Sequence, residues 1–115
     1  MIKVIIGRAS NNQINFLEIK GHANSAPHGE DLICAAVSAV VTGGFNNLVN
    51  VSDYEIKLEE GHAYFKSERP LDEHDEVVIE TIVCGLNTIR DVGAAGALGA
   101  VDDTRQARPR RRPRR

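Results

Sequence analysis

A histidine and a cysteine stand close together in the segment KGHANSAPHGEDLICAAVSAV, residues 20–40. His22 follows an apolar segment that alternates like a strand, and Cys34 lies near the start of a strongly apolar segment that is typical of a buried helix. A fold that brings the end of the strand against the start of the helix gives the thiol an adjacent base, which a cysteine nucleophile requires. The pair therefore predicts covalent catalysis by Cys34, with His22 as the general base.

The position of Cys34 along its helix bears on the same prediction. Asp31 is a good candidate for the N-cap, which would place Cys34 at about the third helical position. There the helix dipole and the unpaired amides favour a thiolate, and the same amides could hold a developing oxyanion. The competing interpretation of Cys34 is a small buried hydrophobe, which is the usual role of an isolated cysteine in an apolar helix.

The remaining candidates for chemistry are weaker. His28 could compete as the base, although it lies in a predicted loop and a base needs a fixed position. His62 repeats the Gly-His-Ala string of residues 21–23, but no cysteine follows it at the start of a helix, so we interpret the repeat as coincidental. A zinc site made of His22, His28 and Cys34 lacks the paired spacing of zinc motifs. No cofactor or metal is predicted.

The elements that must position these residues follow from the hydrophobic pattern. Alternating segments predict two hairpins, and two longer apolar segments predict helices. The expected elements are strands at 1–8 and 14–20, a loop at 21–30, a helix at 31–50, strands at 53–59 and 62–67, and a helix at 72–90. This ββαββα order predicts an α+β domain with two helices packed on a mostly antiparallel sheet. Gly43-Gly44 inside the first helix indicates either a close contact with another backbone or an early helix end.

Length and charge separate one domain from a tail. The chain has 115 residues, enough for a single domain with an appendage but not for two full domains. Residues 1–90 hold seven Lys or Arg and thirteen Asp or Glu, a net charge of −6, whereas residues 91–115 hold seven Arg and three Asp, a net charge of +4. We therefore expect a catalytic domain over residues 1–91 and an Arg-rich tail over residues 92–115 without strand or helix.

The tail has three interpretations. Its block of arginines could bind RNA by neutralising phosphates. It could also be a solvated appendage or an extraneous addition. The two cysteines are too few for a disulfide scaffold, and no apolar stretch approaches the length of a membrane span. The N-terminal segment MIKVIIGRAS is typical of a strand rather than a signal peptide, so we expect a cytoplasmic protein.

The run GHANS followed by GEDLICAAVSA resembles the ribosomal-processing cysteine protease family of Firmicutes and related bacteria, whose members carry GHA and then G-x-D-x-x-C-A-x-x-S-A. The resemblance extends from residue 1 to about residue 91. It implies a small dimeric endopeptidase with a Cys-His dyad and no cofactor. The implied substrate is the N-terminal extension of a bacterial large-subunit ribosomal protein, number twenty-seven, with bulky apolar residues such as Phe beside the cut.

Carried over by position, the resemblance assigns the nucleophile to Cys34 and the general base to His22. Gly21, Asp31 and Ser38 also match the motif. Asp31 could orient His22 or cap the helix, and Ser38, one turn after Cys34, could support the site by hydrogen bonding or simply allow close packing. The chain departs from the family at Asn24, where Asp or Gly is common, and the resemblance does not extend to the Arg-rich tail.

The first predicted helix also bears on assembly. It is apolar on nearly every side, so we expect a symmetric homodimer with an interface near Phe45 or Leu48. The alternative function is a non-enzymatic, ribosome-associated or RNA-binding module that uses the basic tail. The presence of His22 and Cys34 in one motif favours the enzyme, because a binding module has no need of that pair.

Overall fold

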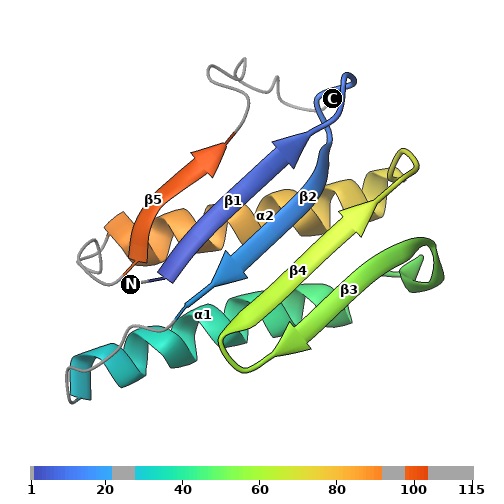
Figure 1. The fold of residues 1–115 in the computed structure, drawn as a ribbon. Coiled ribbons are helices and arrows are strands. Elements are labelled where there is room, and N and C mark those ends of the chain that lie inside the picture. The colour runs from blue at the N-terminus through green and yellow to red at the C-terminus, as the bar shows by residue number, and fades with distance from the viewer. Residues whose placement is uncertain (1, 22–27, 92–97, 104–115) are drawn as a thin grey trace.

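Two helices cover one face of a mixed sheet in the computed structural model, which describes residues 2–21, 28–91 and 98–103 (Figure 1). The strands follow the order β3-β4-β2-β1-β5 across the sheet. The elements are β1 (Ile2–Arg8), β2 (Ile14–Lys20), α1 (His28–Asn46), a 3₁₀ turn η1 (Val51–Asp53), β3 (Tyr54–Glu59), β4 (His62–Ser67), α2 (Glu73–Ile89) and β5 (Leu98–Asp103). β1 to β4 pair antiparallel. The predicted α+β fold, with two helices on a mostly antiparallel sheet, is confirmed.

Both boundaries of the first helix differ from the prediction of 31–50. The helix begins at His28, three residues before the predicted start. It ends at Asn46, where the amides of Asn47 and Leu48 bond back to the carbonyl oxygens three residues earlier and tighten the last turn. The predicted loop 21–30 is therefore helical from His28 onward.

The segment predicted to lack regular structure contains a strand. β5 pairs parallel to β1, with Leu98 opposite Ile2 and Val101 opposite Val4. The chain passes through α2 before it returns to the sheet, which is the long connection that parallel pairing needs. The sequence LGAVDD does not alternate, so the open edge of β1, rather than an intrinsic strand pattern, selects this conformation.

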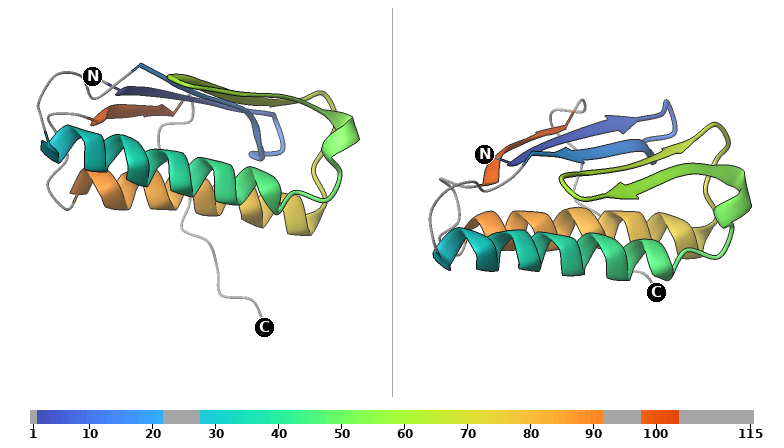
Figure 2. Two further views of the ribbon diagram at one scale, coloured as in Figure 1. Left: turned by 90° about the horizontal axis from the view of Figure 1, so that it is seen from below. Right: turned by 60° about the horizontal axis from the view of Figure 1, so that its bottom comes forward.

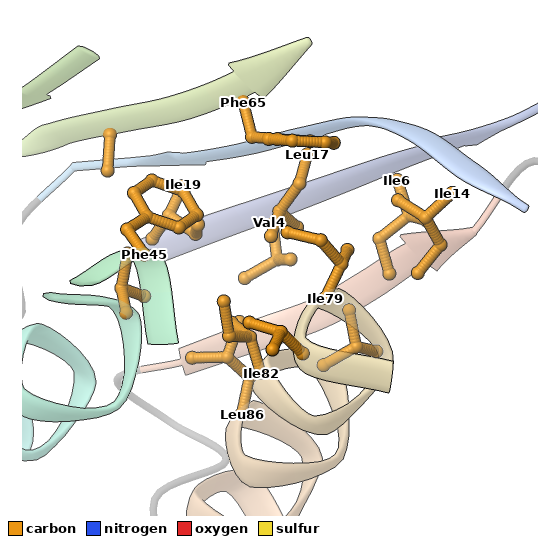
Figure 3. Packing of buried hydrophobic residues seen from close by; sticks show 14 of the residues in the cluster. Val4, Ile6, Ile14, Leu17, Ile19, Phe45, Phe65, Ile79, Ile82 and Leu86 are labelled. Atoms are coloured by element: carbon orange, nitrogen blue, oxygen red, sulfur yellow. The ribbon is translucent and has the colours of Figure 1, made fainter. Parts of the chain in front are cut away.

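The core lies between the inner face of the sheet and the two helices, as Figure 3 shows. Leu17 and Phe65 point from the sheet toward Ile79 and Ile82 of α2 and Phe45 of α1 (Figure 3). Phe45 and Leu48 are only 4% and 6% exposed, so both are core residues of the chain itself. Their burial explains the apolar pattern of this end of α1 without a partner chain, and a dimer interface near them stays a prediction.

Glycine lets the two helices approach closely. A Cβ built on Gly44 would lie 2.3 Å from Cγ1 of Ile82, and one built on Gly85 would lie 2.9 Å from Cγ1 of Val40. Gly43 has nothing within 4 Å of the same position. The predicted close contact exists at Gly44, although it is with the side chain of Ile82 and not with another backbone. The helix also ends early, two residues after Gly44. No helix in the described part of the chain is long and apolar enough to cross a membrane.

A buried carboxylate joins the helices to the sheet at the end of the molecule where α1 stops and α2 starts. Asp75 is fully buried and accepts hydrogen bonds from the backbone amides of Val49 and Asn50, from the Asn50 side chain and from the Tyr54 hydroxyl. Its own amide donates to Asp72, the N-cap of α2. Burial acts to raise the pKa of Asp75, but these hydrogen bonds outweigh it and lower the pKa below its usual value.

Two substitutions one residue apart test the helix contact. Gly44→Ala should lower the melting temperature, because Ile82 is 2% exposed and has no space to retreat from the new methyl group, at a cost of about 1–3 kcal/mol. Gly43→Ala should raise it, since alanine is favoured over glycine in a helix by about 1 kcal/mol and meets no neighbour. Thermal unfolding followed by circular dichroism measures both changes. Shifts of the same sign would contradict the packing described.

Asp75 should make the stability dependent on acid. Since its pKa is lowered in the folded state, its contribution is complete above the unfolded-state pKa of about 3.9 and is lost as the pH falls through the folded-state value. Asp75→Asn should therefore lower the free energy of unfolding by about 3 kcal/mol at pH 7, because the buried donors lose a charged acceptor. The loss should be smaller at pH 3. Urea unfolding at the two pH values measures the difference, and an equal cost at both would refute the assignment.

Candidate active site

A cavity of about 490 Å³ lies between the middle of α1, from Cys34 to Thr42, and one end of the sheet. Small side chains leave this space open, notably Ala35, Ser38 and Ala63, together with Gly21 and Gly61. The other residues that line it are Ile2, Ile19, Cys34, Val37, Val41, Thr42, Leu58, Glu59, Glu60 and His62. The size is that of a typical ligand site, and its lining combines apolar side chains with hydroxyl, thiol and carboxylate groups.

Cys34 is on the helix side of this cavity. Its side chain is half-buried and packs against the core. It is not disulfide-bonded. Because α1 begins at His28, Cys34 is its seventh residue rather than its third, and Asp31 lies within the helix instead of capping it. The prediction that the first-turn amides and the helix dipole act on Cys34 is therefore wrong: the dipole effect fades within the first turn, and an amide two turns into a helix bonds to the carbonyl four residues earlier.

Ser38 borders the same cavity as Cys34, one helical turn further along α1. Its side chain is exposed. This arrangement agrees with the expectation that the two side chains face the same way. His22 and the side chain of Asp31 lie outside the described residues, as does the side chain of His28.

Gly21 determines where the chain leaves the sheet. It follows the last residue of β2 and has a φ of 109°, a conformation that residues with a Cβ rarely adopt. Its amide donates a hydrogen bond of 2.9 Å to the carbonyl oxygen of Gly61, in the turn between β3 and β4. Gly61 also has a positive φ, of 77°. Two glycine turns are thus held together at the mouth of the cavity.

His62 borders the cavity, but its ring belongs to the other side of the sheet. The next residue, Ala63, is buried among the core side chains, and successive residues of a strand point to opposite faces. The Nε2 atom of His62 lies 2.7 Å from Oε2 of Glu18, which alternates in the same way with the buried Leu17 and Ile19. The second Gly-His-Ala string thus borders the same cavity as Cys34 while its histidine pairs with Glu18, and its interpretation as coincidental stays a prediction.

The other histidine and cysteine that the structure describes lie on α2 and do not line the cavity. His74 is exposed near the start of α2, with Nε2 2.9 Å from the carbonyl oxygen of Asn47. Cys84 is exposed on the same helix. Within the described residues, Cys34 is thus the thiol that faces a cavity.

The mouth of the cavity carries negative charge. Glu59 and Glu60 are exposed at the turn between β3 and β4 and line the cavity next to Gly61. The sequence pattern predicts a hairpin at this turn but does not indicate that the turn borders a site. The pairing of Glu59 with His62 and of Leu58 with Ala63 brings the turn to the site, and a hairpin pattern alone does not show which end of a sheet faces a helix.

Comparisons with known proteins identify the family of the chain. The sequence matches the family of cysteine protease Prp over residues 1–93. The ribosomal processing cysteine protease Prp of Bacillus subtilis is 36% identical over 97 residues, which cover 77% of this chain and 87% of that protein. The protein of the same name from Staphylococcus aureus is 25% identical over 95 residues, covering 79% of this chain and 90% of its own length.

Solved structures show the same fold. The structure of the S. aureus protease Prp with a covalently linked product peptide has a TM-score of 0.76 at 22% identity, covering 90% of this chain and 99% of that chain. The protein SMU.848 from Streptococcus mutans has a TM-score of 0.72 at 21% identity, covering 90% and 93%. With a family match that spans most of its length and a cavity lined by a cysteine thiol, the chain belongs to the cysteine protease Prp family.

Proposed function

We propose that this cysteine protease removes the N-terminal extension of a bacterial large-subunit ribosomal protein, number twenty-seven, and that Cys34 and His22 form its catalytic dyad. One observation carries the dyad: Cys34 and Gly21 line the same cavity, and His22 is bonded to Gly21. The curated relatives are named as ribosomal processing proteases, which supports the substrate class.

The reaction runs through an acyl-enzyme. His22 takes the proton of the Cys34 thiol, and the thiolate sulfur attacks the scissile carbonyl carbon. His22 then gives the proton to the leaving amine as the peptide bond breaks. A water molecule, deprotonated by His22, attacks the thioester and releases the new carboxylate and Cys34.

Asp31 and Ser38 have supporting roles in this proposal. Since α1 begins at His28, Asp31 is not its N-cap, and the role that we propose for Asp31 is the other one, to orient His22. Ser38 presents a hydroxyl on the same cavity wall as Cys34, where it can donate a hydrogen bond within the site.

The cavity fits the substrate that the resemblance implies. Its apolar lining residues, such as Ile2, Ile19 and Val41, suit bulky apolar side chains beside the cut, and Glu60 at its mouth suits a basic polypeptide. The net charge of −6 over residues 1–90 also attracts a basic substrate over longer range. Ribosomal proteins bind RNA and are rich in basic residues, and a ribosomal precursor places this activity in the cytoplasm.

We also propose a symmetric homodimer, an assembly that the family resemblance implies. Phe45 and Leu48 are themselves buried within one chain, and an interface near them stays a prediction. One chain has a mass of 12.5 kDa, and light scattering at micromolar protein concentration should give about twice that mass. A mass of one chain at that concentration would refute the dimer.

Cleavage of a peptide that spans the end of the ribosomal-protein extension tests the proposal. Cys34→Ala should abolish cleavage, and His22→Ala should reduce its rate by about 10²–10⁴-fold, the usual contribution of a general acid–base residue. Mass spectrometry of the peptide products measures both effects.

Cys84→Ala and His74→Ala are matched controls, because each removes the same chemical group from an exposed position that does not line the cavity. Both should cleave at the wild-type rate. If Cys34→Ala cleaves at the wild-type rate, Cys34 is not the nucleophile. If His22→Ala keeps full activity, another residue is the general base.

A further inference from the structure

Both helices lie against one face of the sheet and leave its other face uncovered by any described helix (Figure 2). The alternation of the strands places all four lysines of the chain on this other face. Each strand from β1 to β4 supplies one of them. Lys3 pairs directly with Lys20. Each lysine follows or precedes a residue that is buried in the core or packs against it, namely Val4, Ile19, Ile56 and Phe65, so the lysines point to the opposite side. We call this side the outer face; it is the reverse of the face that borders the cavity.

Aromatic rings occupy the centre of the outer face. Phe16 on β2 and Tyr64 on β4 are half-buried, and their ring centroids lie 6.2 Å apart. The ring of His62 meets Tyr64 edge-on at 5.9 Å, and Nζ of Lys57 lies 5.9 Å from the centre of the Tyr64 ring. Burial and a hydrogen bond to Glu55 raise the pKa of Tyr64, so its ring stays uncharged.

The charge of the outer face contrasts with that of the rest of the domain. Among the described side chains of β1 to β4, the outer face carries the four lysines and the carboxylates of Glu18, Glu55 and Glu59. Lys66 also lies 3.8 Å from Glu68. Glu18 is bonded to His62, Glu59 pairs with His62 across the strands, and Glu55 accepts a hydrogen bond from the Tyr64 hydroxyl. The rest of residues 1–90 carries three arginines and ten acidic residues, so the outer face is less acidic than the rest of the domain.

The pairing of Lys3 with Lys20 points to an anionic partner. Like charges directly opposite each other on neighbouring strands destabilise a sheet. Lys20 also pairs with His62 on its other side, so three basic side chains form one row across β1, β2 and β4. A bound anion such as a phosphate group would relieve this repulsion.

We propose that the outer face binds single-stranded RNA. Aromatic side chains in the middle of an antiparallel sheet stack bases, and lysines around them neutralise the phosphates. Stacking of this kind tolerates many sequences, because every base has a flat face. Since the outer face and the cavity lie on opposite sides of the sheet, the protein can hold RNA and a peptide together. If the proposed function holds, RNA in an assembling ribosomal particle brings the protease to its substrate.

Fluorescence anisotropy with a labelled twelve-nucleotide oligouridine tests this proposal on the full chain. Lys3→Ala/Lys66→Ala removes two exposed lysines of the outer face that do not line the cavity. It should weaken binding about tenfold at 50 mM salt and reduce the slope of log affinity against log salt by about 1.4, since each phosphate contact on a single strand contributes about 0.7. Tyr64→Leu keeps an apolar side chain but removes a stacking surface, and should weaken binding at least fivefold.

Controls separate the outer face from other basic groups. Arg69→Ala/Arg90→Ala removes two positive charges away from the outer face and should change the affinity less than twofold. A full-length variant with serine in place of arginine at positions 108, 110, 111, 112, 114 and 115 measures binding by the tail. When Lys3→Ala/Lys66→Ala or Tyr64→Leu is added to this serine variant, its affinity for RNA should still fall.

Several outcomes would overturn the proposal. These are an absence of RNA binding, loss of all binding in the serine variant, equal effects of the lysine and arginine pairs, or no effect of Tyr64→Leu. Cleavage of the isolated peptide by Lys3→Ala/Lys66→Ala should stay at the wild-type rate. Because cleavage and RNA binding are measured separately, failure of the proposed function would be distinguishable from failure of this inference.

Discussion

The fold depends on the buried carboxylate of Asp75. Four donors from the segment after α1 and from β3 converge on it, and its own helix begins at the neighbouring cap, Asp72. A charge without these bonds could not be buried, because desolvation costs several kcal/mol per ion. The carboxylate thus fixes the end of α1, the start of α2 and the start of β3 relative to one another.

Because α1 is one continuous helix, fixing its C-terminal end also positions Cys34 in the active site. The helix has 19 residues and is about 28 Å long, at 1.5 Å per residue. Its C-terminal half is fixed by the core around Phe45 and by the contact of Gly44 with Ile82. The middle of the helix carries small side chains toward the sheet, so a cavity remains beside Cys34 where large side chains would have closed the core.

The sheet separates two kinds of chemistry. Its inner face is apolar and forms the core and one wall of the cavity, whereas its outer face presents lysines around Phe16 and Tyr64. The period of two along a strand makes this possible, since neighbouring residues of one strand serve opposite faces. His62 and Ala63 show it directly: the ring of His62 bonds to Glu18 on the outer side, and Ala63 is buried among the core side chains.

Local patterns in the amino-acid sequence are enough to predict the first four strands, the two helices and the candidate nucleophile. Alternation predicts the four antiparallel strands, the two longer apolar segments predict the helices, and the spacing of His22 and Cys34 within a family motif indicates the chemistry. Only the tertiary structure decided the start of α1, the pairing of β5 and the burial of Phe45 and Leu48. Each of these depends on a partner distant in sequence: the open edge of β1 selects β5, and the sheet covers the end of α1. The closeness of Gly21 to Gly61, which builds the mouth of the cavity from two separate hairpin ends, is likewise a property of strand register that no local pattern contains.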